Sequence, residues 1–183
     1  DPQTFAFTIN SKNAVAPATE GALKVFYGTK RGGKPQIVNF EDELGGHFGS
    51  TKEQAKGAID RDNELTGEDK KGSVNEYTIT LKNPLRVPDI GRWYPNKVFD
   101  EIIEPMGLKY PKTVKSDLLG DVEITNRTGE DIINILKENG YDGLVYENKY
   151  EGDGDSYIVL DESQIKEPNK PADPAAITEA AST

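Results

Sequence analysis

Cysteine is absent from this 183-residue chain, and that absence removes several kinds of chemistry at once. Without a thiol there is no disulfide framework, no thiolate zinc site and no cysteine nucleophile. Histidine is nearly absent too, because His47 is the only one, so a metal site built on a histidine pair has no second member. Long apolar runs are also missing, since no stretch approaches the roughly 20 apolar residues of a membrane-spanning helix. We therefore expect a soluble protein with no membrane partner.

Basic residues are in the minority. The chain has 22 Lys and Arg against 32 Asp and Glu, which gives a formal net charge of −10. Proteins that bind the phosphate backbone need a positive face, so we expect no nucleic-acid partner. The same charge permits another class, a small acidic inhibitor or nucleic-acid mimic, although no motif supports that class.

Length and composition predict one folded domain and a tail. A single domain commonly takes about 100–200 residues. After Pro168 the chain is mostly Ala, Pro, Ser and Thr, with almost no large apolar side chain to bury. We therefore expect residues 1–167 to form the domain and residues 168–183 to be a flexible tail or linker. The chain opens on Asp1, as expected for a processed product or a domain of a longer polypeptide.

Alternating or clustered β-forming residues predict five strands, at residues 5–9, 23–27, 74–81, 143–146 and 156–160. Three helices are predicted among them: one capped by Ser50 with Glu53 three residues on, a short one within 93–106, and the clearest at 128–139. Residues 61–72 are charged and contain glycine, which predicts a loop. Strands outnumber helices and the two do not alternate strictly, so the fold class is α+β rather than a doubly wound parallel sheet.

The residues alone single out few candidates for chemistry. A lone histidine is more often a structural hydrogen-bonding group than a catalyst, but His47 lies in a glycine-rich run that suits the approach of a ligand, so both interpretations stay open. The acidic run that begins at Glu151 has a spacing like that of a calcium loop, but Ser156 stands where the sharp turn needs glycine. We therefore expect no metal.

Four short pieces, in order, carry a more specific signal: FYGT at 26–29, GGHFGST at 45–51, ITLKNPL at 79–85, and GYDGLVYEN followed by DSYIVLDESQIK within 140–166. Together they resemble the ADP-ribosyltransferase fold, in the branch found in large polyvalent proteins of phages and mobile elements. The resemblance covers roughly residues 22–166. It implies a split β-sheet sandwich core with short peripheral helices, NAD as the substrate, and a protein acceptor from a host or partner. A toxin-like protein of this kind would act in the host-cell cytoplasm or be associated with the virion.

The resemblance assigns NAD contacts to two early segments. Gly28 would offer its backbone N–H and C=O to the nicotinamide amide because it has no Cβ. Thr29 and Ser50 would donate hydroxyl hydrogen bonds to ribose or phosphate. Phe48, or the neighbouring histidine ring, would stack on nicotinamide, and the helix start at Ser50 and Thr51 would offer N–H groups to the diphosphate.

Four residues are assigned to the reaction itself: Tyr27, His47, Glu151 and Gln164. Tyr27 stands where the family has a histidine that holds the adenosine ribose, and Gln164 stands where active transferases often carry a glutamate. A neutral amide cannot take a proton, so Glu151 or Glu162 would have to assist, or the acceptor would supply its own base. We therefore expect a slow NAD-dependent mono-ADP-ribosyltransferase. The alternative is a catalytically weak or inactive relative that serves as a binding or virion-associated module. For single residues a structural interpretation stands beside the functional one: Gln164 closing a sheet-edge hydrogen bond, and Tyr27 packing as a half-buried ring.

Overall fold

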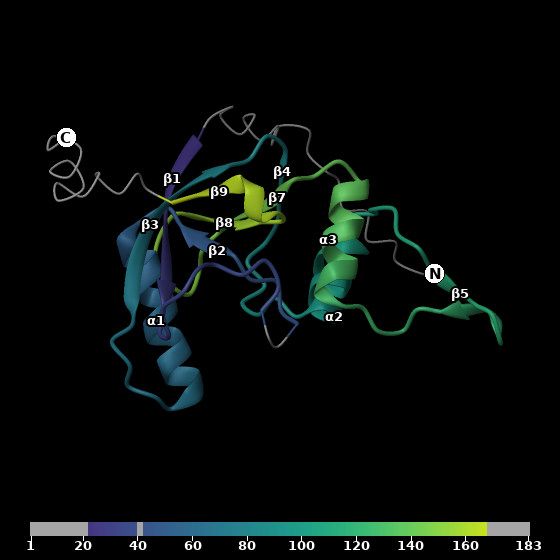
Figure 1. Cartoon of the computed structure of the whole chain (residues 1–183), viewed down its shortest axis with the longest axis horizontal. Helices are drawn as coiled ribbons and strands as arrows, with labels where there is room; N and C mark the ends of the chain where they lie inside the picture. Colours follow the sequence, from purple (N-terminus) through teal and green to yellow (C-terminus); the bar gives the residue numbers. More distant parts are fainter. Residues whose placement is uncertain (1–21, 40–41, 168–183) are drawn as a thin grey trace, which may run out of the picture.

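The computed structural model describes residues 22–39 and 42–167, so the strand predicted at 5–9 and the tail predicted at 168–183 lie outside the described residues. Within them, seven strands form one sheet in the order β4-β7-β8-β2-β1-β3-β9 (Figure 1). These strands are β1 Ala22–Thr29, β2 His47–Gly49, β3 Ser73–Thr80, β4 Pro84–Arg86, β7 Gly143–Glu147, β8 Asp155–Val159 and β9 Ile165–Lys166. A separate hairpin, β5 Thr113–Ser116 and β6 Gly120–Glu123, extends away from the sheet (Figure 1).

The sheet is joined weakly at its middle. Strands β1 and β3 pair antiparallel along their whole length, from Ala22↔Thr80 to Thr29↔Ser73. Strands β1 and β2 share one residue pair, Phe26↔Gly49. Every pairing in the sheet is antiparallel except that of β4 with β7. The half β4-β7-β8-β2 and the half β1-β3-β9 are therefore connected at one point and part beyond it.

The helices are α1 Lys52–Thr66, α2 Pro95–Val98 with the π-helical turn η1 Phe99–Ile103, α3 Gly129–Glu138, and the short 3-10 turn η2 Glu162–Gln164. Helix α3 begins at its predicted cap, where Thr128 and Asp131 form a capping box. Two predictions for α1 were wrong. The cap is Thr51, which bonds Gln54 in a capping box, rather than Ser50. The helix also continues into the predicted loop and ends at Gly67, whose φ of 67° is left-handed.

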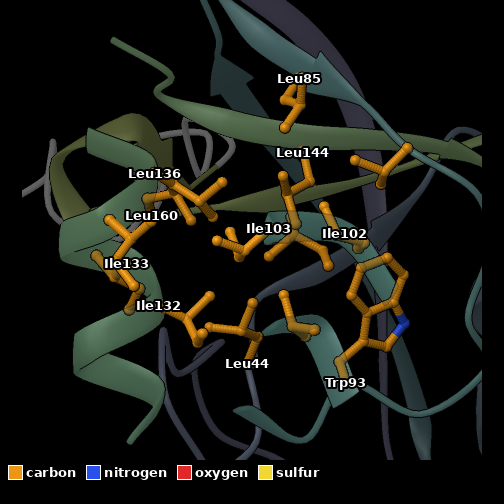
Figure 2. Packing of buried hydrophobic residues seen from close by; sticks show 14 of the residues in the cluster. Leu44, Leu85, Trp93, Ile102, Ile103, Ile132, Ile133, Leu136, Leu144 and Leu160 are labelled. Atoms are coloured by element: carbon orange, nitrogen blue, oxygen red, sulfur yellow. The ribbon is translucent and has the colours of Figure 1, made fainter. Parts of the chain in front are cut away.

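The main core lies between α3 and the β4-β7-β8 half of the sheet. Ile132, Ile133 and Leu136 of α3 point toward Leu144 of β7 and Leu160 just beyond β8 (Figure 2). The cluster is completed by Leu44 of the β1–β2 connection, by Trp93 of the connection after β4, and by Ile102 and Ile103 of η1 (Figure 2). This packing fixes one half of the sheet.

A second core spans the two halves of the sheet. It comprises Val25, Tyr77, Ile79 and Leu81 on the side of β1 and β3, and Phe48 of β2 and Val159 of β8 on the other side. Because side chains alternate along a strand, Val25 and Tyr27 of β1 face this core, whereas Phe26 and Gly28 face α1. The chain is thus α+β, as predicted, with a large and mostly antiparallel sheet and few short helices. Among the residues that the structure describes, no helix has the length and apolar character to cross a membrane.

Candidate functional site

A cavity opens where β1 and β2 part. Its volume is about 620 Å³, within the range of about 300–1,000 Å³ found for small-molecule sites. The walls come from the end of β1 and the connection after it, from the start of β2, from the second half of α1, and from the segment after β4. Five of the nine residues that the sequence nominated line it: Tyr27, Gly28, Thr29, His47 and Glu151. An early and a late part of the chain therefore meet in one cavity.

The end of β1 forms one wall. The ring of Tyr27 lies 5.8 Å from that of Phe48 and 6.3 Å from that of Tyr77, between centroids, and burial raises the pKa of its phenol. It is the half-buried packing residue that the alternative interpretation predicted. The Thr29 hydroxyl donates to the Gly32 carbonyl oxygen (3.3 Å) and so shapes the turn that follows.

Gly28 has a structural reason to be glycine that the sequence did not reveal. A Cβ built on it would lie 1.9 Å from the backbone oxygen of Ala55 and 3.2 Å from Cγ1 of Ile59. Only a residue with no side chain lets α1 pack this closely on β1. The glycine is therefore required by the packing of α1, whatever its backbone offers to a ligand.

His47 has both ring nitrogens occupied by the protein. Its Nε2 lies 2.7 Å from the Leu44 carbonyl oxygen, and its Nδ1 lies 3.1 Å from the Tyr146 hydroxyl. A carbonyl oxygen only accepts, so Nε2 carries the hydrogen. Burial lowers the pKa of His47, so the ring is neutral at pH 7 and Nδ1 accepts from Tyr146. His47 offers the cavity the side of its ring and no free nitrogen, which matches its structural interpretation.

Glu151, in the β7–β8 connection, brings a carboxylate to the cavity. Its Oε2 accepts a hydrogen bond from the Asn148 side-chain amide (2.9 Å), and its Oε1 lies 3.7 Å from Nη1 of Arg61. Its backbone lies against α1 at Gly57, where a Cβ would meet the Glu151 carbonyl oxygen at 2.1 Å. The missing side chain of Gly57 therefore lets the Glu151 segment approach the cavity.

Arg61 connects three parts of the wall. Its guanidinium donates to the Gly91 carbonyl oxygen (3.1 Å) and lies over the Tyr150 ring, 4.3 Å from the centroid, in addition to its contact with Glu151. Five Lys and Arg and four Asp and Glu line the cavity, so its lining is slightly positive within a chain of net charge −10. An anionic or zwitterionic ligand suits this balance.

Three predicted NAD contacts lie away from this cavity. The Phe48 side chain is completely buried in the second core. The Ser50 hydroxyl donates to Oε1 of Gln54 (2.9 Å), and Thr51 caps α1. The cavity meets α1 along Ala58–Thr66, the opposite end of the helix, so the α1 N-terminus does not open into it.

Gln164 is the main departure from the predicted site. Its Nε2 donates to the carbonyl oxygens of Thr80 (3.3 Å) and Asp142 (2.7 Å), and its Oε1 accepts from the Leu160 backbone N–H (3.0 Å). Thr80 pairs with Ala22 at the start of β1, whereas the cavity lies at its end, six residues along at Gly28. At about 3.3 Å per residue, these two places are about 20 Å apart. The structure does not bring Gln164 to the cavity, and its amide ties the sheet together as the alternative interpretation predicted.

Sequence reasoning missed three residues that shape the site: Gly57, Arg61 and Asn148. Gly57 has a signal in hindsight, since a glycine within a helical pattern needs a packing reason. Arg61 was placed in a loop because its neighbours are charged. Asn148 was part of a quoted piece but had no role.

Among residues 22–39 and 42–167, no group of three or more acidic or histidine side chains could hold a metal ion.

No protein-family model matches this chain, and no curated protein or solved structure matches it either. The proposal for its function therefore rests on the resemblance of the four sequence pieces and on the geometry of the cavity.

Proposed function

We propose that this chain is an NAD-dependent mono-ADP-ribosyltransferase with an ADP-ribosyltransferase-like fold, and that Glu151, not Gln164, supplies the carboxylate. One observation carries the proposal: Gly28 and Thr29 of the early segment, His47, and the late Glu151 line one cavity where the two halves of the sheet part. Gly28, Thr29 and His47 come from the quoted pieces, and Glu151 lies between the two parts of the last piece. The resemblance in sequence and the convergence in space are separate lines of support.

The transfer needs a carboxylate but no acid to release the leaving group. The bond between C1′ of the ribose and the ring nitrogen of nicotinamide breaks, and its electron pair moves to that nitrogen, so the cation leaves as neutral nicotinamide. A lone pair of the acceptor forms the new bond to C1′, and the acceptor's proton passes to the carboxylate. The transition state resembles an oxocarbenium ion, which a nearby negative charge stabilises.

The cavity has groups for the other parts of NAD. The rings of His47 and Trp93, 5.5 Å apart between centroids, both line it and suit the cationic pyridinium. Arg31 and Lys34, on the connection after β1, line it as well and suit the diphosphate. The acceptor is proposed to be a protein of a phage host or of another partner, which would place the reaction in the host cytoplasm.

One observation favours the alternative of a binding module with weak or no turnover. The carboxylate of Glu151 faces Arg61, and a cation beside it offsets the charge that would stabilise an oxocarbenium ion. In that case NAD binds and is not consumed.

The test measures binding and transfer separately. Calorimetry with NAD reports binding, and transfer of labelled ADP-ribose from NAD to lysate proteins reports the reaction. Glu151→Gln should keep NAD binding and lower transfer by about 10²–10³-fold, the usual effect of losing one group that stabilises transition-state charge. Glu138→Gln, an exposed change of the same kind at the end of α3, is the control and should leave both unchanged. Folded wild-type protein that neither binds NAD nor transfers label would refute the proposal, and binding without transfer would select the alternative.

A further inference from the structure

The carboxylate of Glu151 is held from behind by a buried side-chain amide. Asn148, which is 5 % exposed, follows β7 directly. Its Nδ2 donates to Oε2 of Glu151 (2.9 Å) and to Oγ of Ser156 (2.9 Å). Its Oδ1 accepts from the backbone N–H groups of Tyr150 (3.0 Å) and Glu151 (2.8 Å). Two donors and two acceptor positions are thus all used, and the two backbone donors fix which end of the amide is oxygen.

A line of polar groups continues from Asn148 to His47. Ser156 accepts from Asn148, which leaves its own hydrogen for the neighbouring Tyr146 hydroxyl; burial raises the pKa of Tyr146, and the Ser156 hydroxyl acts in the opposite direction. The Tyr146 hydroxyl in turn donates to Nδ1 of His47, and Nε2 of His47 donates to the Leu44 carbonyl oxygen. Ser156, Tyr146 and Asn148 are each at most 5 % exposed, so water does not compete strongly for these bonds.

We propose that Asn148 is a positioning residue that holds the Glu151 carboxylate toward the cavity, and that Ser156, Tyr146 and His47 continue its hydrogen bonds as a chain behind it. This inference rests on the proposed function for its catalytic consequence. The order of donors and acceptors, by contrast, is a property of the folded protein alone. An amide suits the position because a carboxylate there would face Glu151 without a hydrogen to donate.

The charged surroundings make Asn148→Asp a sharp test. Arg61 of α1 faces Glu151, while Glu43, Asp89 and Glu151 carry the negative charges nearest His47. Asn148→Asp keeps the oxygen that accepts the two backbone N–H groups and removes both donors. Near neutral pH it places two carboxylates together. At lower pH the pair shares one proton, and the new carboxyl group, once protonated, can again donate to Glu151.

The first measurement needs no activity. Because His47 is the only histidine, its ring nitrogens give one unambiguous pair of ¹⁵N signals. We expect the neutral tautomer with hydrogen on Nε2. Tyr146→Phe removes the donor to Nδ1, and Asn148→Asp adds a negative charge, so both should raise the pKa of His47. Asn126→Asp, an exposed change of the same kind, is the control. A hydrogen on Nδ1 in the wild type, or a His47 pKa that neither variant moves, would overturn the chain.

The second measurement is transfer from NAD. Asn148→Asp should lower kcat by about 10–100-fold at pH near 7.5, the range for partners that orient a reactive group, and leave KM for NAD nearly unchanged. Its rate relative to wild type should rise as the pH falls toward about 5.5, as the shared proton restores a donor. A variant that only disturbs folding would not recover in this way. If Asn148→Asp does not fold, Ser156→Ala, which removes the link to Tyr146 and keeps the amide, decides instead and should lower kcat with KM unchanged.

The outcomes separate the two proposals. A wild type that transfers label, with Asn148→Asp or its substitute equal to it at every pH, refutes the positioning role and leaves the proposed function standing. A wild type that transfers nothing refutes the enzyme and with it the catalytic consequence. In that case the His47 signals still decide whether the chain exists.

Discussion

Gly57→Ala is the substitution for which general helix propensity and this structure predict opposite signs. Gly57 lies in the middle of α1, where replacing glycine by alanine ordinarily stabilises a helix by about 1 kcal/mol. Here the new Cβ would lie 2.1 Å from the backbone oxygen of Glu151, 2.8 Å from its carbonyl carbon and 2.9 Å from its Cα. All three atoms are backbone, so no side chain can rotate away, and either α1 or the β7–β8 connection must move.

The size of the effect follows from these two contributions. Overpacking of this severity costs about 3 kcal/mol, the upper end of the common range. Subtracting the helix gain of about 1 kcal/mol leaves a loss of about 2 kcal/mol in the free energy of unfolding. For a chain of this length, that corresponds to a fall in Tm of about 4–8 °C. Because the displaced segment carries Glu151, transfer from NAD should fall as well.

Urea unfolding at constant pH measures the change. Asp60→Ala, at an exposed position of the same helix, is the matched control, because it gains propensity without meeting another backbone and should not destabilise. A Gly57→Ala protein that is more stable than wild type by about 1 kcal/mol would show that propensity alone acts there. The close packing of α1 on the Glu151 segment would then be refuted.

Two further predictions concern residues that the sequence nominated. Gln164→Glu should not increase transfer, and it should destabilise the fold by about 1–3 kcal/mol in urea, because it removes the donors to two carbonyl oxygens; increased transfer would return Gln164 to the site. For His47, burial lowers the pKa below its ordinary 6.5, so the unfolded chain binds more protons below that value. Its contribution to stability should be complete above about pH 6.5 and be lost as the pH falls toward the folded pKa, and a His47→Asn variant should lack this slope. The carboxyls of Glu68 and Asp161 have pKa values of about 2, against ordinary values of 4.5 and 3.8. Their contribution to stability should therefore be lost only at lower pH, below the range in which His47 titrates.

The elements with a clear hydrophobic period were predictable. Alternation along residues 74–81 gave β3, and the stripe of Ile132, Ile133 and Leu136 behind a threonine cap gave α3. The prediction ended α1 too early because the second half of the helix is charged and carries few apolar residues. These residue types are compatible with a helix, and α1 ends only at Gly67. Strands β2, β4 and β9 have only three, three and two residues, too few to show a period.

The site was predictable in part. The quoted pieces named the early wall, and Glu151 was a secondary choice among the acids. The placement of Gln164 was not predictable, because order along the chain does not say which end of a strand a distant residue meets; that depends on the pairing of β3 with β9. Asn148 and Gly57 act through contacts with Glu151, which only the folded chain brings together.

The most direct test is a crystal structure of the wild-type protein soaked with NAD or a non-hydrolysable analogue. We predict that the ligand occupies the opening between β1 and β2, with its nicotinamide ribose within hydrogen-bond reach of the Glu151 carboxylate. Ligand density at the Gln164 end of the sheet, or an empty opening at saturating ligand, would contradict the proposed site.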